Sequence, residues 1–172
     1  MVKHYSNLDV EKWRKDGAVV IEGLFSLEEI QSVHEDIDKV FGYKKGGSPI
    51  IKNDGNPVTI EEQFLNFENI PFYCSPALNL IGVHPQLISL ARDALKTNDV
   101  RIYQSQAWAK FSGETDFEQS FHCDYGNHTL TVPSKQITQN SITFLIYFSD
   151  VSEEYGPAHY VTRTDSEKID KI

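Results

Sequence analysis

The sequence is poor in cysteine and has no long hydrophobic run. Its 172 residues include two cysteines, Cys74 and Cys123, too few for the disulfide framework of a small secreted domain. No apolar segment reaches the roughly 20 residues that a transmembrane helix needs, and residues 1–5 lack the apolar stretch of a signal peptide. We therefore expect a soluble, cytoplasmic protein whose two cysteines are free thiols.

Basic residues are also scarce. Lys and Arg number 16 against 25 Asp and Glu, which gives a formal net charge of −9. Such a chain lacks the positive surface that attracts nucleic acid or anionic membranes, so we expect neither as a partner. An anionic ligand would need an Arg or Lys placed locally at its site.

The first helix and strand expected from the sequence lie close to the N-terminus. Residues 8–15 predict a short helix, which Gly17 would end. The apolar, β-branched residues 18–21 predict a short buried strand. Residues 43–58 are rich in turn-forming residues and predict a long loop.

Two longer helices are expected further along. Ser26 and Glu29 form a capping-box pattern, and apolar residues then recur at helical spacing as far as Phe41. Pro85 suits the first turn of a second helix, which would run to about Leu95 with one apolar side.

Beyond residue 98 the apolar residues recur with the period of strands. In residues 141–151 both alternating sets are largely apolar, which predicts an inner strand covered on both faces. Helices followed by strands predict an α+β fold, with helices over about 1–98 and a sandwich or barrel over about 99–172 of a single domain. The expected strands span residues 101–110, 119–125, 141–151 and 158–163.

A histidine and an aspartate lie two residues apart in one of these expected strands. His122 and Asp124 would point to the same face, and Cys123 to the other. An imidazole and a carboxylate on one face can hold a metal ion, and with a distant histidine they form the facial triad of non-heme Fe(II) oxygenases. A two-residue motif arises easily by chance, so the surrounding sequence has to support it.

Four blocks of the sequence, in the same order, resemble the phytanoyl-CoA dioxygenase family. Residues 16–26, followed by an acidic helix, resemble the family's opening. Residues 103–110 and the strand with His122-x-Asp124 are similar to the matching block of its ectoine-hydroxylase branch. Residues 149–161 resemble its segment of strand, acidic turn, Gly-Pro and strand.

The resemblance implies a double-stranded β-helix core (jelly-roll, cupin-like) with the N-terminal helices packed outside. It also implies an Fe(II)- and 2-oxoglutarate-dependent dioxygenase that hydroxylates a small organic molecule with dioxygen through a ferryl-oxo intermediate. His122 and Asp124 would be the first two iron ligands and the catalytic residues. In such enzymes the cofactor supplies the difficult chemistry and the protein positions the reactants.

The family's third ligand, a histidine, and an arginine that binds the far carboxylate of 2-oxoglutarate would both lie beyond Ile172. We therefore expect this sequence to be the N-terminal part of a longer domain, without its last strands and inactive as it stands, unless the missing residues are supplied otherwise, for example by a neighbouring subunit.

Three polar residues precede the motif on an expected strand. Gln104, Gln106 and Lys110 would share one face, and could line the cavity for the cosubstrate or the substrate. The alternative is a solvated polar face, and the sequence does not decide between them.

Other candidates are weaker. His159 lies downstream of Asp124, but its block matches a family position that is not a ligand. For His128 a solvated loop is favoured over the mouth of a pocket, Arg163 is expected to be exposed at a strand end, and residues 153–154 are expected in a solvated turn.

Two other functions stay open. A non-catalytic jelly-roll binding protein, or a truncated pseudoenzyme, could keep two ligands without turnover. A cupin-like metalloenzyme could act without 2-oxoglutarate. The sequence indicates neither the substrate nor the oligomeric state.

Overall fold

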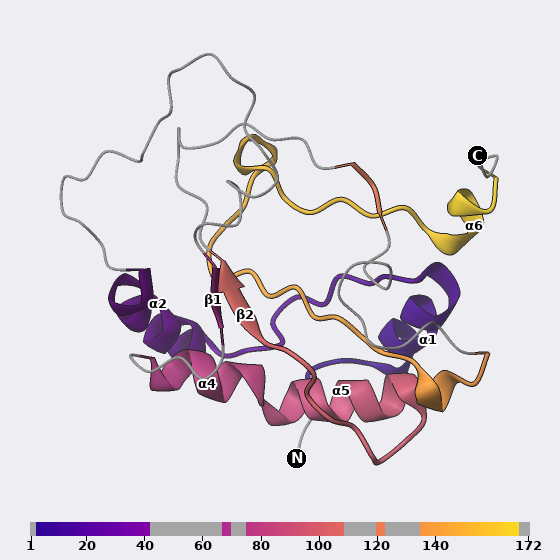
Figure 1. Cartoon of the computed structure of the whole chain (residues 1–172), viewed down its shortest axis with the longest axis horizontal. Helices are drawn as coiled ribbons and strands as arrows, with labels where there is room; N and C mark the ends of the chain where they lie inside the picture. The colour runs from indigo at the N-terminus through magenta and orange to yellow at the C-terminus, as the bar shows by residue number, and fades with distance from the viewer. Residues whose placement is uncertain (1–2, 42–66, 70–74, 109–119, 123–134, 169–172) are drawn as a thin grey trace. The chain divides into compact units, whose positions relative to one another are not determined.

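The computed structural model describes residues 3–41, 67–69, 75–108, 120–122 and 135–168. By contacts the chain divides into two compact units. The first comprises residues 1–26, 84–101 and 121–172, and the second comprises residues 27–83 and 102–120. No helix in the described ranges is both long and apolar enough to cross a membrane. The elements, in chain order, are α1 (Asn7–Asp16), α2 (Leu27–Phe41), β1 (Phe67–Asn69), α4 (Pro76–Gly82), α5 (Pro85–Leu95), β2 (Gln106–Trp108), the 3₁₀ turns η2 (Ile137–Gln139) and η3 (Glu153–Tyr155), and α6 (Arg163–Ser166) (Figure 1).

Helix α1 of the first unit is fixed at both ends by local chemistry. At its start, the Asp9 backbone N–H donates to Ser6 Oγ at 3.2 Å and the Ser6 backbone N–H donates to Asp9 Oδ2 at 2.7 Å. This reciprocal pair is a capping box. At its end, Gly17 adopts the left-handed conformation with φ of 87°, and its N–H donates to the Trp13 carbonyl at 2.8 Å. The predicted helix and its stop at Gly17 are confirmed.

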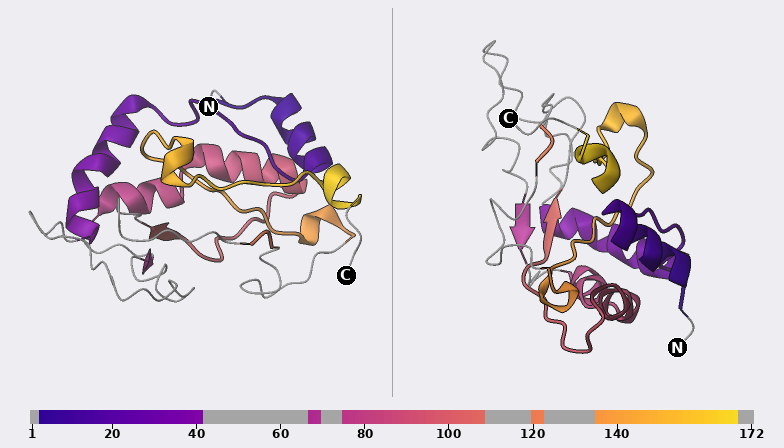
Figure 2. Two further views of the ribbon diagram at one scale, coloured as in Figure 1. Left: turned by 90° about the horizontal axis from the view of Figure 1, so that it is seen from above. Right: turned by 90° about the vertical axis from the view of Figure 1, so that its right-hand side faces the viewer.

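Helix α5 forms the centre of the first unit's core. It begins at Pro85 and ends at Leu95, as predicted. Helix α1 packs against it (Figure 2). The core contains the buried side chains of Tyr5, Val10, Leu24, Leu87, Leu90 and Ala94, with partly buried Trp13, Ile21, Phe25, Ile142, Phe144 and Ile146 packed around them.

Arg14 joins α1 to the end of α5. Its guanidinium donates to the carbonyl of Ala94 at 3.2 Å and to the carbonyl of Asp93. The last carbonyls of a helix have no partner within the helix and carry the negative end of its dipole. The Arg14 cation therefore satisfies and stabilises the C-terminus of α5.

The second unit contains α2 packed against α4. Helix α2 begins directly after Ser26, where the capping-box pattern placed it, and Val33 on it is fully buried. Ser75, also fully buried, donates through Oγ to Asp36 Oδ2 at 3.1 Å and accepts from the Leu78 N–H at 3.1 Å. One serine therefore caps α4 and ties it to α2.

Strands β1 and β2 pair antiparallel in the second unit, with Phe67 opposite Trp108 and Asn69 opposite Gln106. They are the only strands in the described part of the chain. Residues 18–21, 141–151 and 158–163 contain no strand, so the predictions of strands there are wrong. A strand needs a hydrogen-bonded neighbour, and the described residues offer these segments none.

Residues 141–149 nevertheless alternate in burial as a strand would. Ile142, Phe144 and Ile146 are partly buried against the first unit's core. The side chains between them face solvent, with Leu145 70% and Tyr147 50% exposed. The predicted alternation of side chains between two faces of this segment is confirmed. The prediction that both faces are covered is wrong.

Candidate functional site

The two residues of the metal motif lie at the edge of a described segment. His122 is exposed and ends residues 120–122, which are not in a strand. The strand predicted over residues 119–125 is therefore wrong for these three residues. Asp124 and Cys123 lie outside the described residues, so the prediction that His122 and Asp124 share one face stays a prediction.

The polar residues that precede the motif are only partly described. Gln106 is the first residue of β2, and Gln104 lies before the strand. Both side chains are exposed, while Ser105 and Ala107 between and after them are partly buried. This alternation agrees with a shared face for Gln104 and Gln106. Lys110 lies outside the described residues.

His159 has a carboxylate neighbour. Its Nε2 lies 3.1 Å from Glu153 Oε1, and both side chains are more than half exposed. Glu153 belongs to η3, so the expected solvated turn over residues 153–154 is confirmed. Across the described ranges, no three side chains of His, Cys, Asp or Glu come together in a way that could hold a metal ion. His128 lies outside those ranges.

Arg163 is exposed, as expected, but it begins a helix and does not end a strand. The Thr162 hydroxyl caps α6 by accepting from the Asp165 N–H at 3.2 Å, and Thr162 Oγ1 donates to Asp165 Oδ2 at 2.7 Å. A helix is favoured here because this local cap satisfies the first turn. The Thr162-x-x-Asp165 spacing was the sequence signal for it.

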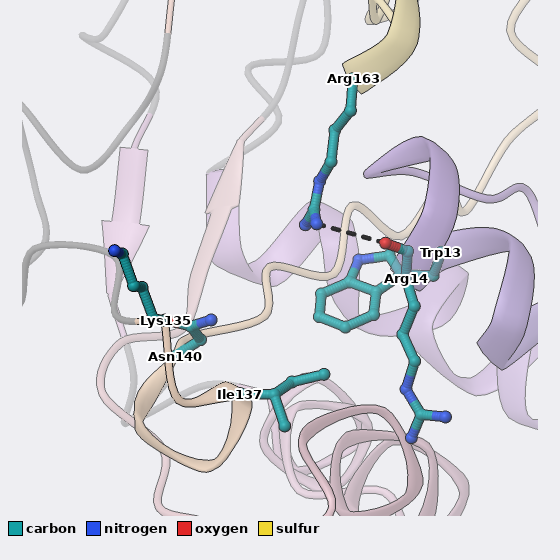
Figure 3. Close-up of a pocket in the computed structure, with 6 residues that line it drawn as sticks. All are labelled: Trp13, Arg14, Lys135, Ile137, Asn140 and Arg163. Carbon is teal, nitrogen blue, oxygen red and sulfur yellow. Dashed lines mark hydrogen bonds between the residues drawn. The ribbon is translucent and has the colours of Figure 1, made fainter.

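The first unit contains a hollow that sequence reasoning missed. It has a volume of about 220 Å³ and lies beside the C-terminal end of α1 (Figure 3). Arg163 reaches into it and donates through Nη1 to the Arg14 carbonyl at 3.2 Å. We name it the basic hollow; it is lined by Trp13, Arg14, Lys135, Ile137, Asn140 and Arg163.

Besides the basic hollow, the first unit contains a cluster of polar side chains around Asp93. The Tyr5 hydroxyl lies 2.7 Å from Asp93 Oδ2 and 2.7 Å from Ser89 Oγ, and Lys3 forms a salt bridge with the same carboxylate. The hydrogen bond from Lys3, and after it that from Tyr5, lowers the pKa of Asp93. Burial raises the pKa of Tyr5. The network joins the N-terminal segment to α5.

A model of one oxygenase family matches most of the chain. It is described as phytanoyl-CoA dioxygenase (PhyH) and covers residues 13–169, so the chain belongs to the phytanoyl-CoA dioxygenase family. Membership implies a cupin or jelly-roll fold and oxygenase chemistry of the Fe(II)/2-oxoglutarate-dependent superfamily. No curated protein and no solved structure gave a match.

Proposed function

We propose that this protein is an Fe(II)- and 2-oxoglutarate-dependent dioxygenase that hydroxylates a small organic molecule, with residues 1–172 lying in a single domain. The family match carries the proposal, because residues 13–169 include His122-x-Asp124. A fold alone does not define a reaction, since one fold can hold many different sites. The metal motif inside the matched region adds the chemistry that the family relationship leaves general.

His122 and Asp124 have the donor types that suit Fe(II). A neutral imidazole nitrogen and an ionised carboxylate oxygen are two parts of the facial triad, which leaves several positions on the metal open. When bound, Fe(II) supplies the activation of dioxygen, with 2-oxoglutarate as the cosubstrate. Gln104, Gln106 and Lys110 are proposed to line the cavity for the cosubstrate or substrate.

The test measures succinate formed from 2-oxoglutarate by the full-length protein, with Fe(II), ascorbate and a broad panel of small organic molecules. His122→Ala and Asp124→Ala should each lower the rate by at least about 100-fold, because each removes a metal ligand. His159→Ala is the matched control and should keep its rate, since His159 is already placed beside Glu153.

Each possible result of this test would contradict the proposal or favour one named alternative. Equal turnover by wild type and His122→Ala would overturn the proposed ligand pair. Loss of turnover only in His159→Ala would transfer the ligand role to that residue. A protein that binds Fe(II) but consumes no 2-oxoglutarate would contradict the dioxygenase proposal and favour a binding protein.

A further inference from the structure

The basic hollow collects positive charge in a protein that is otherwise acidic. Three of the six side chains that line it are cationic and none is a carboxylate, although the chain carries 25 acidic and 16 basic residues. Of the three cations, Arg163 reaches into the concave space, whereas Arg14 lies near the carboxylate of Asp93.

Arg163 is the best-placed cation of the hollow. Its guanidinium donates to the Arg14 carbonyl at 3.2 Å, near the negative end of α1 (Figure 3). Its side chain also passes close to Gly17, where an added Cβ would lie 3.1 Å from Arg163 Cγ and 3.2 Å from Nε. A guanidinium has five N–H donors, so one bond to a carbonyl leaves others for a ligand. The described part of the chain places no carboxylate against it.

The other lining residues supply charge and an apolar wall. Lys135 is exposed and forms no ion pair with any described residue. Trp13 and Ile137 contribute partly buried apolar surface. Arg14 lines the hollow, but its guanidinium is turned to the end of α5, where Asp93 and Ala94 accept its hydrogen bonds. Arg14 therefore adds charge at a distance and does not supply donors.

We propose that the basic hollow binds the carboxylate or phosphate group of a small organic molecule. Arg163 would hold two oxygens through its planar fork, a geometry that lysine lacks, and Lys135 would add a point charge at the rim. A volume of about 220 Å³ falls below the roughly 300 Å³ of typical small-molecule pockets. The hollow therefore suits a head group, with the rest of the molecule lying along Trp13 or in solvent.

The experiment is a calorimetric titration of protein freed of metal with EDTA and then dialysed into buffer without EDTA, because EDTA is itself a polycarboxylate. Inorganic phosphate is the ligand in one arm and succinate in the other. A parallel readout is the fluorescence of Trp13 in a Trp108→Phe background. We expect saturable binding that weakens as ionic strength rises, because the contact is charged. Arg163→Gln should weaken it at least tenfold, and Lys135→Gln about threefold.

The matched control is Arg101→Gln. Arg101 is an exposed cation paired with Asp99 and lies outside the hollow, so its loss should leave the affinity unchanged. Arg163→Lys keeps the charge without the fork and should recover only part of the lost affinity. Circular dichroism checks that each variant folds. If Arg163→Gln does not fold, Lys135→Gln decides, because that side chain supports no described contact.

Binding of both anions, or of one, supports the proposal and identifies the oxyanion preferred. No saturable binding of either anion would overturn it, and so would equal affinities in wild type and both hollow variants. The readout needs neither iron nor turnover. A failure here is therefore distinct from a failure of the proposed dioxygenase.

Discussion

Asp93 shows how much one carboxylate can organise. It accepts hydrogen bonds from Tyr5 and Lys3, and the backbone carbonyl of the same residue accepts from Arg14. Three separate parts of the first unit therefore meet at one position of α5. No local sequence pattern marks this residue, because its partners lie about 80 to 90 positions away.

Asp93 makes stability depend on pH in a predictable direction. Its pKa is lowered in the folded protein, so its contribution is present above pH about 4 and disappears as pH falls through the lowered pKa. Asp93→Asn should lower the free energy of unfolding by about 1 kcal/mol near pH 7, a modest value because the group is partly exposed. Chemical denaturation at several pH values measures it. A difference between wild type and variant that grows towards pH 3 would contradict the assignment.

The backbone conformation and the surroundings of Gly17 favour glycine over any other residue. Its φ of 87° is left-handed, and an added Cβ would lie 3.1 Å from Arg163 Cγ. Gly17→Ala should therefore lower the free energy of unfolding by about 1–2 kcal/mol. The double variant with Arg163→Ala separates the two causes, since it removes the contact and leaves the backbone strain. An unchanged melting curve for Gly17→Ala would show that the turn differs from the one described.

At the scale of elements, the sequence predicted helices well and strands poorly. Helices α1 and α5 carry local signals, namely Gly17 at a C-terminus and Pro85 in a first turn. Helix α4 was missed although Ser75 and Pro76 form a start signal. Alternation is a local signal for an extended segment, but a strand forms only when another segment pairs with it.

In segment 141–149, where burial alternates, two adjacent residues can be compared to test which side chains are buried. Phe144 packs against the core and Leu145 is 70% exposed. Phe144→Ala should therefore lower the free energy of unfolding by about 2 kcal/mol, less than for a fully buried ring. Leu145→Ala should change it by less than about 0.5 kcal/mol. Thermal unfolding of the two variants checks the pair, and a larger effect at Leu145 would mean that its face is covered in solution.

At the scale of the whole molecule, the two candidate sites differ in how they could be found. His122 and Asp124 are two residues apart, so their spacing suggested the motif and the family-like blocks around it supported it. The basic hollow joins Trp13 to Arg163, which are separated by almost the whole chain. Only folding brings such residues together, and no periodicity or motif in the sequence predicts that they meet. The sequence nevertheless predicted one property of such a site, namely that an anion bound by this acidic protein would need an Arg or Lys placed beside it.

Metal binding should stabilise the folded protein as a whole. A ligand that binds only the folded state adds about 2.7 kcal/mol at 100 times its dissociation constant. For a chain of this size that corresponds to a rise in melting temperature of about 5–10 °C. We expect this rise with Mn(II), a redox-inert stand-in for Fe(II), under nitrogen. Asp124→Ala and His122→Ala should remove it, because each leaves too few donors to hold the ion.

Two controls make that thermal shift specific to the proposed iron ligands. His159→Ala should keep the full shift, since His159 lies beside Glu153 and outside the motif. Lys135→Gln should keep it as well, while losing affinity for phosphate in the metal-free titration. That contrast would establish two separate ligand sites in one acidic chain. An equal shift in wild type and Asp124→Ala would instead mean that Mn(II) binds elsewhere, on scattered surface carboxylates.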